Sequence, residues 1–131
     1  MRIPSVTVLV VDDAAAARLL IMTTLDSLGL STIPASDGES ALNAVRNFHP
    51  DAIVTDLEMP GMNGEQMIEA LRNSEHPGLR DIPVIVCSSK VNADTLAKLA
   101  ELHIDTFVPK PVDVQMLARA ALRLFDSGLG K

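Results

Sequence analysis

The sequence contains very few aromatic residues and no tryptophan or tyrosine. Three of its 131 residues are phenylalanine, and aromatic residues make up 2% of the chain. Any hydrophobic core must therefore be built from aliphatic side chains, and no indole or phenol ring is present to stack on a planar cofactor. The single cysteine, Cys87, cannot form an internal disulfide, so nothing indicates an oxidising compartment. We interpret Cys87 as a small buried residue without redox activity.

Long apolar runs and clusters of basic residues are also missing. No apolar run approaches the roughly 20 residues of a membrane span, and the N-terminus lacks the layout of a signal peptide because acids arrive at Asp12. The net charge of -6 and the pI near 4.9 argue against a nucleic-acid surface, which needs clustered Lys and Arg. These absences predict a cytoplasmic domain that binds neither membranes nor nucleic acid directly.

The chain does contain enough aliphatic residues for the core of one domain. Apolar residues make up 47% of its length, an ordinary content for a globular domain. Five short apolar runs alternate with five helical patterns. This order predicts an α/β fold, a (βα)5 doubly wound five-stranded parallel sheet in a flavodoxin-like three-layer sandwich. We expect the strand order 2-1-3-4-5, with the domain at 1–127 and a tail or the start of a linker at 128–131.

The expected strands and helices follow from these runs and from capping signals. The expected strands are 6–11, 31–35, 52–55, 83–88 and 106–109, and the expected helices are 14–28, 36–47, 64–73, 91–102 and 111–127. Spacing predicts a capping box of Ser36 with Glu39, an N-cap at Asn63, a helix start at Pro111 and a helix end at Gly128. The expected buried face of the first helix is Ala17, Leu20, Ile21, Thr24 and Leu28.

Acidic residues stand directly after two of the predicted strands. Asp12 and Asp13 follow the first strand, and Asp56 ends the third and opens the turn-rich stretch D-L-E-M-P-G-M-N-G. In the expected order these strand ends flank the crevice where open α/β sheets bind ligands. Three converging carboxylates repel one another unless a cation arrives, and Mg²⁺ prefers such oxygen ligands. We therefore predict a Mg²⁺ site of Asp12, Asp13 and Asp56, completed by the backbone carbonyl of Glu58.

Two further side chains are expected at the same edge of the sheet. Ser88 ends the fourth predicted strand and Lys110 follows the fifth. A hydroxyl can donate to one phosphate oxygen and an ammonium can pair with another, while the carboxylate of Asp56 can act as a nucleophile to give an aspartyl phosphate. The pattern therefore predicts a phosphoryl-transfer site built from positioning and charge.

These pieces together resemble the receiver (CheY-like) domain of bacterial two-component response regulators. The matching pieces, which span the whole chain in family order, are Asp12-Asp13, the stretch from Asp56, Ser88 and Lys110-Pro111. The resemblance implies that Asp56 accepts a phosphoryl group from a histidine kinase or a histidine phosphotransfer protein, with Mg²⁺ as cofactor. It also implies that Ser88 and Lys110 bind the phosphoryl group and that the Lys110-Pro111 bond is cis.

The resemblance further implies a switch rather than an enzyme with external turnover. Such a domain assists only its own phosphorylation and dephosphorylation. Phe107 stands at the family's switch aromatic, three residues before Lys110, and fits static core as well as a switch. The activated surface would be the fourth helix, fifth strand and fifth helix, and would control a protein partner or a fused output domain. The implied assembly is a monomer or a phosphorylation-promoted dimer.

Several positions depart from the family pattern. The first helix opens with alanines from Ala14, where a polar cap is usual, at a cost of about 1 kcal/mol. Ser89 replaces a smaller residue beside the phosphate position, and His103 stands where a glycine is usual. Glu58 and Lys90 flank the site, and we hypothesise that they tune the lifetime of the phosphoryl group by pairing across the pocket.

Three other functions compete with this interpretation. The chain could be the N-terminal receiver of a longer transcriptional or enzymatic regulator. An FMN-binding flavodoxin-like domain would share the fold, but acids stand where its phosphate loop is needed. A Mg²⁺-dependent phosphatase with an aspartate nucleophile would share the chemistry, but the first strand is not followed by D-x-D.

Overall fold

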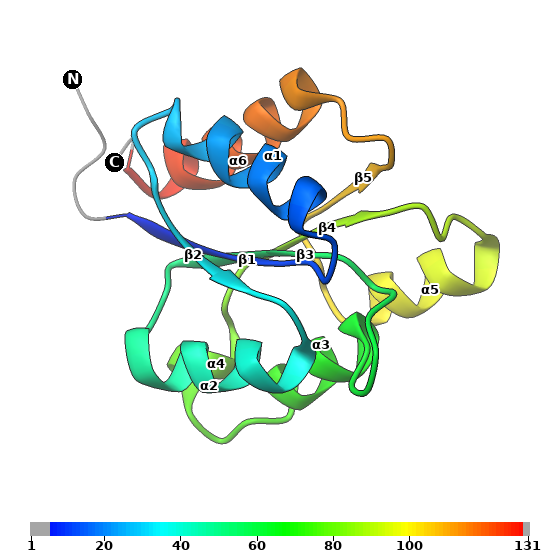
Figure 1. Ribbon diagram of the computed structural model, residues 1–131. Helices are drawn as coiled ribbons and strands as arrows, with labels where there is room; N and C mark the ends of the chain where they lie inside the picture. The colour runs from blue at the N-terminus through cyan, green and yellow to red at the C-terminus, as the bar shows by residue number, and fades with distance from the viewer. Residues whose placement is uncertain (1–5, 130–131) are drawn as a thin grey trace.

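In the computed structural model, which describes residues 6–129 and the last four of these as backbone only, five parallel strands form one sheet (Figure 1). The strands are β1 (Thr7–Val11), β2 (Ser31–Ala35), β3 (Ala52–Thr55), β4 (Val84–Ser88) and β5 (Thr106–Pro109). Their order is β2-β1-β3-β4-β5, which confirms the predicted flavodoxin-like fold. Pro34 lies in the edge strand β2, where its missing N–H costs no ladder hydrogen bond.

Helices cover both faces of the sheet. They are α1 (Ala15–Asp26), α2 (Gly38–Phe48), α3 (Gly64–Arg72), the short α4 (Pro77–Arg80), α5 (Ala93–Glu101) and α6 (Val114–Leu129). Figure 1 shows α1 and α6 on one face and α2, α3 and α5 on the other. No helix within the described part of the chain is both long and apolar enough to cross a bilayer.

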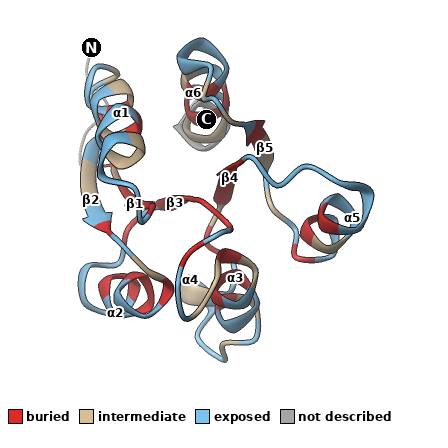
Figure 2. Cartoon of the chain, turned by 45° about the vertical axis from the view of Figure 1, so that its right-hand side comes forward, coloured by how far each residue is buried: buried red, intermediate tan, exposed pale blue. Residues whose placement is uncertain are grey.

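The sheet divides the core into two aliphatic clusters. Leu9 and Val11 of β1 face the cluster shared with α2, α3 and α5, whereas Val8 and Val10 face the cluster shared with α1 and α6. Figure 2 shows the buried residues concentrated in the sheet and on the inner sides of the helices. The central strands are buried on both faces, which explains why their sequences are continuous apolar runs.

The start of α2 differs from the prediction. The helix begins at Gly38, and its N-cap is Asp37, whose side chain accepts a hydrogen bond from the N–H of Ser40. The predicted capping box of Ser36 with Glu39 is therefore wrong. Asp and Ser cap helices about equally well, so sequence spacing alone did not separate the two neighbours.

The buried face of α1 is also rotated from the predicted one. Ile21 and Leu25 are fully buried, whereas Leu20 is 44% exposed. Apolar residues occur around most of this helix, so its sequence periodicity did not fix which side faces the core. The N-terminus of α1 has no side-chain cap, as predicted.

The last helix begins later and ends later than predicted. The cis Lys110–Pro111 bond agrees with the family resemblance, but α6 starts at Val114, where the Asp113 carboxylate accepts the first free helix N–H groups. Gly128 does not end the helix, because α6 continues to Leu129. The tail predicted at 128–131 therefore starts inside α6, and residues 130–131 lie outside the described part of the chain.

Candidate functional site

Most of the predicted site residues lie at the carboxyl ends of β1, β3, β4 and β5, where backbone hydrogen bonds hold the main chain. The N–H of Asp56 donates to the carbonyl of Val11 at 2.9 Å, and the N–H of Asp12 donates to that of Ala35 at 3.1 Å. The N–H of Lys110 likewise donates to the carbonyl of Ser88 at 3.0 Å. These bonds continue the sheet ladder past the strand ends, so they fix the backbone from which the site side chains project.

Three carboxylates converge in this crevice. Asp12, Asp13 and Asp56 each offer an oxygen, and these oxygens lie within 4.8 Å of one another. Asp12 is fully buried and Asp56 is 7% exposed, whereas Asp13 is exposed. A cluster of hard oxygen donors with one open side fits Mg²⁺, which keeps several of its waters. The three acids predicted as metal ligands are therefore brought together.

Lys110 bridges two of these acids. Its Nζ donates to Asp12 Oδ2 at 2.8 Å and to Asp56 Oδ2 at 3.0 Å. Burial lowers the pKa of Lys110, but the hydrogen bonds and charges of the two carboxylates outweigh it and raise the pKa above the ordinary value. The ammonium therefore stays charged and offsets part of the repulsion within the acidic cluster.

The other oxygen of Asp56 is held by the following turn. Asp56 Oδ1 accepts the N–H of Leu57 at 2.6 Å and that of Glu58 at 3.4 Å. Gly64 closes the turn by donating its N–H to the carbonyl of Leu57, and a Cβ on Gly64 would overlap the carbonyl oxygen of Asp56. A glycine is needed here because the backbone of α3 begins directly against the backbone of Asp56.

Ser88 and Phe107 lie outside the acidic cluster. Ser88 is fully buried, and its hydroxyl oxygen accepts the N–H of Lys90 at 3.1 Å. No hydrogen bond among the described residues joins Ser88 to Asp56. Phe107 pairs with Val86 of β4 and packs, half-buried, against the core cluster on the side of α2, α3 and α5.

The predicted pairing of Glu58 with Lys90 is wrong. Lys90 Nζ lies 3.6 Å from Glu65 Oε2, and the carboxylate of Glu58 accepts instead from the hydroxyl of Ser89 at 3.4 Å. Glu65 belongs to the first turn of α3. The contact between Glu65 and Lys90 could not be predicted from the sequence, because it depends on how α3 packs beside the loop after β4.

Arg18 is a site neighbour that the sequence interpretation missed. Its Nη1 donates to the backbone carbonyl of Asp12 at 2.7 Å and so ties α1 to the loop that carries two of the acids. The sequence did offer a sign of this contact, because a basic residue stands one helical turn after Ala14, which cannot cap the helix, and close to Asp12 and Asp13.

Cys87 is fully buried, and burial raises the pKa of its thiol to about 12, which agrees with an inert residue.

A five-stranded parallel sheet with three acids and one lysine at its carboxyl ends defines a receiver-type α/β domain. The chain belongs to the response regulator receiver domain family, which it matches over residues 8–122. It is thus a receiver domain of two-component signalling, as the sequence resemblance predicted.

Relatives include both short and long proteins. The chain is 32% identical to the chemotaxis protein CheY of Pseudomonas aeruginosa over 120 residues, which cover 91% of this chain and 95% of that protein. It is 34% identical over 118 residues to the sensor histidine kinase GacS of Pseudomonas protegens, covering 88% of this chain. The chain spans only 13% of that kinase, so receivers of this kind occur alone and within longer proteins.

Solved structures show the same fold. A response regulator receiver protein from Pseudomonas putida is 27% identical with a TM-score of 0.84, covering 94% of this chain and 98% of that one. The signal receiver domain of a histidine kinase from Syntrophus aciditrophicus is 28% identical with a TM-score of 0.84, covering 95% and 92%.

Proposed function

We propose that Asp56 accepts a phosphoryl group from a phosphohistidine of a histidine kinase or a histidine phosphotransfer protein. The convergence of Asp12, Asp13 and Asp56 with the Lys110 ammonium carries this proposal. Asp12 and Asp56 each have one oxygen held by a backbone N–H and one held by Lys110, but Asp12 is fully buried whereas Asp56 is 7% exposed. The domain that would perform this step is the predicted one, 1–127, extended to Leu129, where α6 ends.

The transfer is a displacement at phosphorus. A carboxylate oxygen of Asp56 forms the new bond to phosphorus while the bond from phosphorus to the donor imidazole nitrogen breaks, and that nitrogen takes up a proton. Lys110 pairs with a phosphoryl oxygen, and the Ser88 hydroxyl donates to another once Ser88 has moved toward it. In the structure the Ser88 hydroxyl oxygen accepts the N–H of Lys90, a contact that this movement would alter.

Asp12, Asp13 and Asp56 are the side chains that would hold Mg²⁺, with the backbone carbonyl of Glu58 as a further ligand. The ion would neutralise the oxygens of the phosphoryl group. The acidic cluster supports this assignment, because all three acids are oxygen donors and Asp13 leaves one side open to water.

The output surface in this proposal is α5, β5 and α6, the fourth long helix, the fifth strand and the last helix. Phe107 lies in β5, where it would turn inward when Ser88 moves. Glu58, Ser89 and Lys90 would tune the lifetime of the phosphoryl group, with Glu58 bonded to the Ser89 hydroxyl and Lys90 paired with Glu65. Partners are a cytoplasmic phosphodonor and a protein target, or an output domain if the chain belongs to a longer regulator.

Intact-mass measurement tests the proposal. The protein is incubated with Mg²⁺ and a small-molecule phosphodonor, and wild type is compared with Asp56→Asn and with Asp94→Asn, an exposed acid of α5. We expect wild type and Asp94→Asn to gain one phosphoryl group and Asp56→Asn to gain none. A gain in Asp56→Asn, or none in wild type with either a small-molecule donor or a phosphorylated histidine phosphotransfer protein, would contradict the assignment.

A further inference from the structure

Helix α5 contributes one buried apolar side chain, Leu99, to the core, and several of its other contacts are polar. It is the one helix or strand of residues 6–129 whose backbone does not closely approach another element at several points. Figure 2 shows it at the periphery, beyond β5. Within the helix only Thr95 and Leu99 are buried, and Leu96 is 41% exposed. Leu99 and the C-cap residue Leu102 belong to the core cluster, so the apolar anchor of α5 is small and lies toward its C-terminal end.

One face of α3 supplies three polar links to α5 and the loop before it. Glu65 Oε2 lies 3.6 Å from Lys90 Nζ, and Glu69 Oε2 lies 3.5 Å from Lys98 Nζ. Arg72 donates from Nε to the carbonyl of Leu102 at 2.8 Å, at the C-terminal end of α5. The three α3 positions are spaced i, i+4, i+7, so they share one side of the helix. We call these three links the α3–α5 seam.

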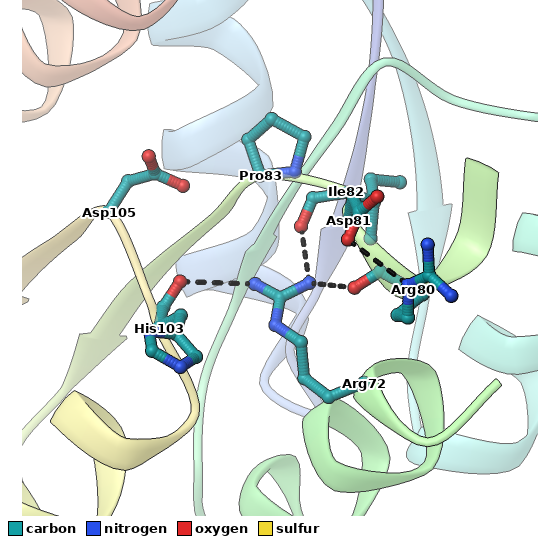
Figure 3. Close-up of a pocket in the computed structure, with 7 residues that line it drawn as sticks. All are labelled: Arg72, Arg80, Asp81, Ile82, Pro83, His103 and Asp105. Carbon is teal, nitrogen blue, oxygen red and sulfur yellow. Dashed lines mark hydrogen bonds and ion pairs between the residues drawn. The ribbon is translucent and has the colours of Figure 1, made fainter. Parts of the chain in front are cut away.

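Arg72 is the firmly held end of the seam. Figure 3 shows its guanidinium among the carbonyls of Arg80, Ile82 and His103, to which it donates at 3.0, 2.7 and 3.2 Å, at one side of a hollow of about 410 Å³. Partial burial lowers the pKa of Arg72, with Asp105 and Asp81 opposing, but a guanidinium stays protonated. A fixed cation at the C-terminus of α5 also suits the helix dipole.

The other two links are open to solvent. The side chains of Lys90 and Glu65 are 42% and 22% exposed, and those of Lys98 and Glu69 are 40% and 50% exposed. Exposed ion pairs contribute little individually and are screened by salt. The seam is therefore strong at the Arg72 end and weak at the end near the acidic crevice, where the N–H of Lys90 also donates to Ser88 Oγ.

We propose that the α3–α5 seam is an electrostatic latch. Arg72 anchors the C-terminal end of α5, the Lys98–Glu69 pair holds the helix against α3, and the Lys90–Glu65 pair holds the loop before it. Loss of these two pairs releases α5 by local opening while the sheet and the other helices stay folded. The latch involves an element of the proposed output surface, and its test does not require phosphorylation of Asp56.

Amide hydrogen exchange followed by mass spectrometry tests the latch in the full chain. Exchange of α5 is compared with exchange of α6 at about 20 mM and about 500 mM sodium chloride, between which the screening length falls from about 20 Å to about 4 Å. In wild type we expect α5 exchange to rise about threefold or more at high salt, relative to α6. In Glu65→Gln/Glu69→Gln we expect fast α5 exchange at both salt concentrations.

Two further variants separate the latch from a general effect of charge. Glu39→Gln/Glu75→Gln makes the same change in net charge at exposed positions outside the seam and should behave as wild type. Glu69→Lys/Lys98→Glu exchanges the two ends of one pair and should restore most of the slow exchange that Glu69→Gln loses. Far-UV circular dichroism melts confirm folding, since the chain has no tryptophan to report it.

The latch is overturned if α5 exchange is insensitive to salt and to Glu65→Gln/Glu69→Gln. It is equally overturned if α5 and α6 accelerate together, because that result indicates loss of global stability, or if the control Glu39→Gln/Glu75→Gln behaves as the seam variant does.

Discussion

At the scale of single residues, Lys110 holds the acidic crevice together. Its ammonium is the one cation bonded to both Asp12 and Asp56 among the described residues. Three parallel strands, β1, β3 and β5, bring these groups together from positions far apart in the sequence. Sequence placed all three at one sheet edge through the strand order. The direct hydrogen bonds from Lys110 Nζ to the two carboxylates are visible only in the three-dimensional structure.

Replacing Lys110 with methionine should destabilise the protein by about 1–3 kcal/mol near neutral pH, because two buried or nearly buried carboxylates lose their shared donor. Mg²⁺ should restore part of this loss, since the ion supplies the missing positive charge. Chemical denaturation followed by circular dichroism measures both effects. Stability of Lys110→Met equal to wild type without Mg²⁺ would contradict the role assigned to the ammonium.

The pH dependence of this pair follows from the direction of the shift. The pKa of Lys110 is raised in the folded protein, because the carboxylates outweigh burial. Its stabilising contribution is therefore complete below the unfolded lysine pKa of about 10.4 and is lost as pH rises through the higher folded value. Wild type should lose stability across that alkaline range more steeply than Lys110→Met.

At the scale of elements, the helices differ in whether a side chain caps their N-termini. α3 carries a complete capping box in which Asn63 and Gln66 exchange side-chain and backbone hydrogen bonds, and α2 is capped by Asp37. α1 has no side-chain cap at Ala14, although the backbone there is extended, as in capped helices. The loop that carries Asp12 and Asp13 therefore relies on Arg18 and on the Ala14 N–H, which donates to Asp12 Oδ1.

Replacing Ala14 with serine should raise the free energy of unfolding by about 0.5–1 kcal/mol, because the new hydroxyl can accept a free N–H of the first turn. Ala16→Ser, inside the same turn, is the matched control and should be neutral or slightly destabilising. Urea denaturation measures both variants. If the two variants shift the midpoint equally, the gain does not come from capping.

At the scale of the whole molecule, the acidic crevice couples the fold to cation binding. The three carboxylates come from two strands and converge only when the sheet is formed, so a divalent ion should bind the folded chain far better than the unfolded one. Preferential binding to the folded state raises its stability, by about 2.7 kcal/mol at a ligand concentration one hundred times the Kd.

The thermal midpoint should therefore rise with Mg²⁺ concentration in wild type and rise much less in Asp13→Asn. Asp13 is exposed, so this substitution should leave the metal-free protein folded. The matched control is Asp26→Asn, an exposed acid at the far end of α1, which should keep the full response. An equal response in all three proteins would place the Mg²⁺ effect outside the crevice.

The sequence alone determined the sheet, its strand order and the acids at its carboxyl ends. Buried parallel strands need continuous apolar runs, and in an open α/β sheet the polar residues that follow such runs meet at one edge. The predicted caps at Ser36 and Gly128 are wrong, because neighbouring residues compete as caps. The predicted buried face of α1 is wrong because apolar residues surround most of that helix, so its sequence does not show which side faces the core.

Only the tertiary structure decided which polar side chains touch. Lys90 pairs with Glu65 rather than Glu58. Arg18 donates to the Asp12 carbonyl, and Arg72 donates to four backbone carbonyls. The physical reason is that long charged side chains can reach several partners at similar cost. The choice among these partners depends on how elements far apart in the sequence pack together, and the local sequence around each charged residue does not specify that packing.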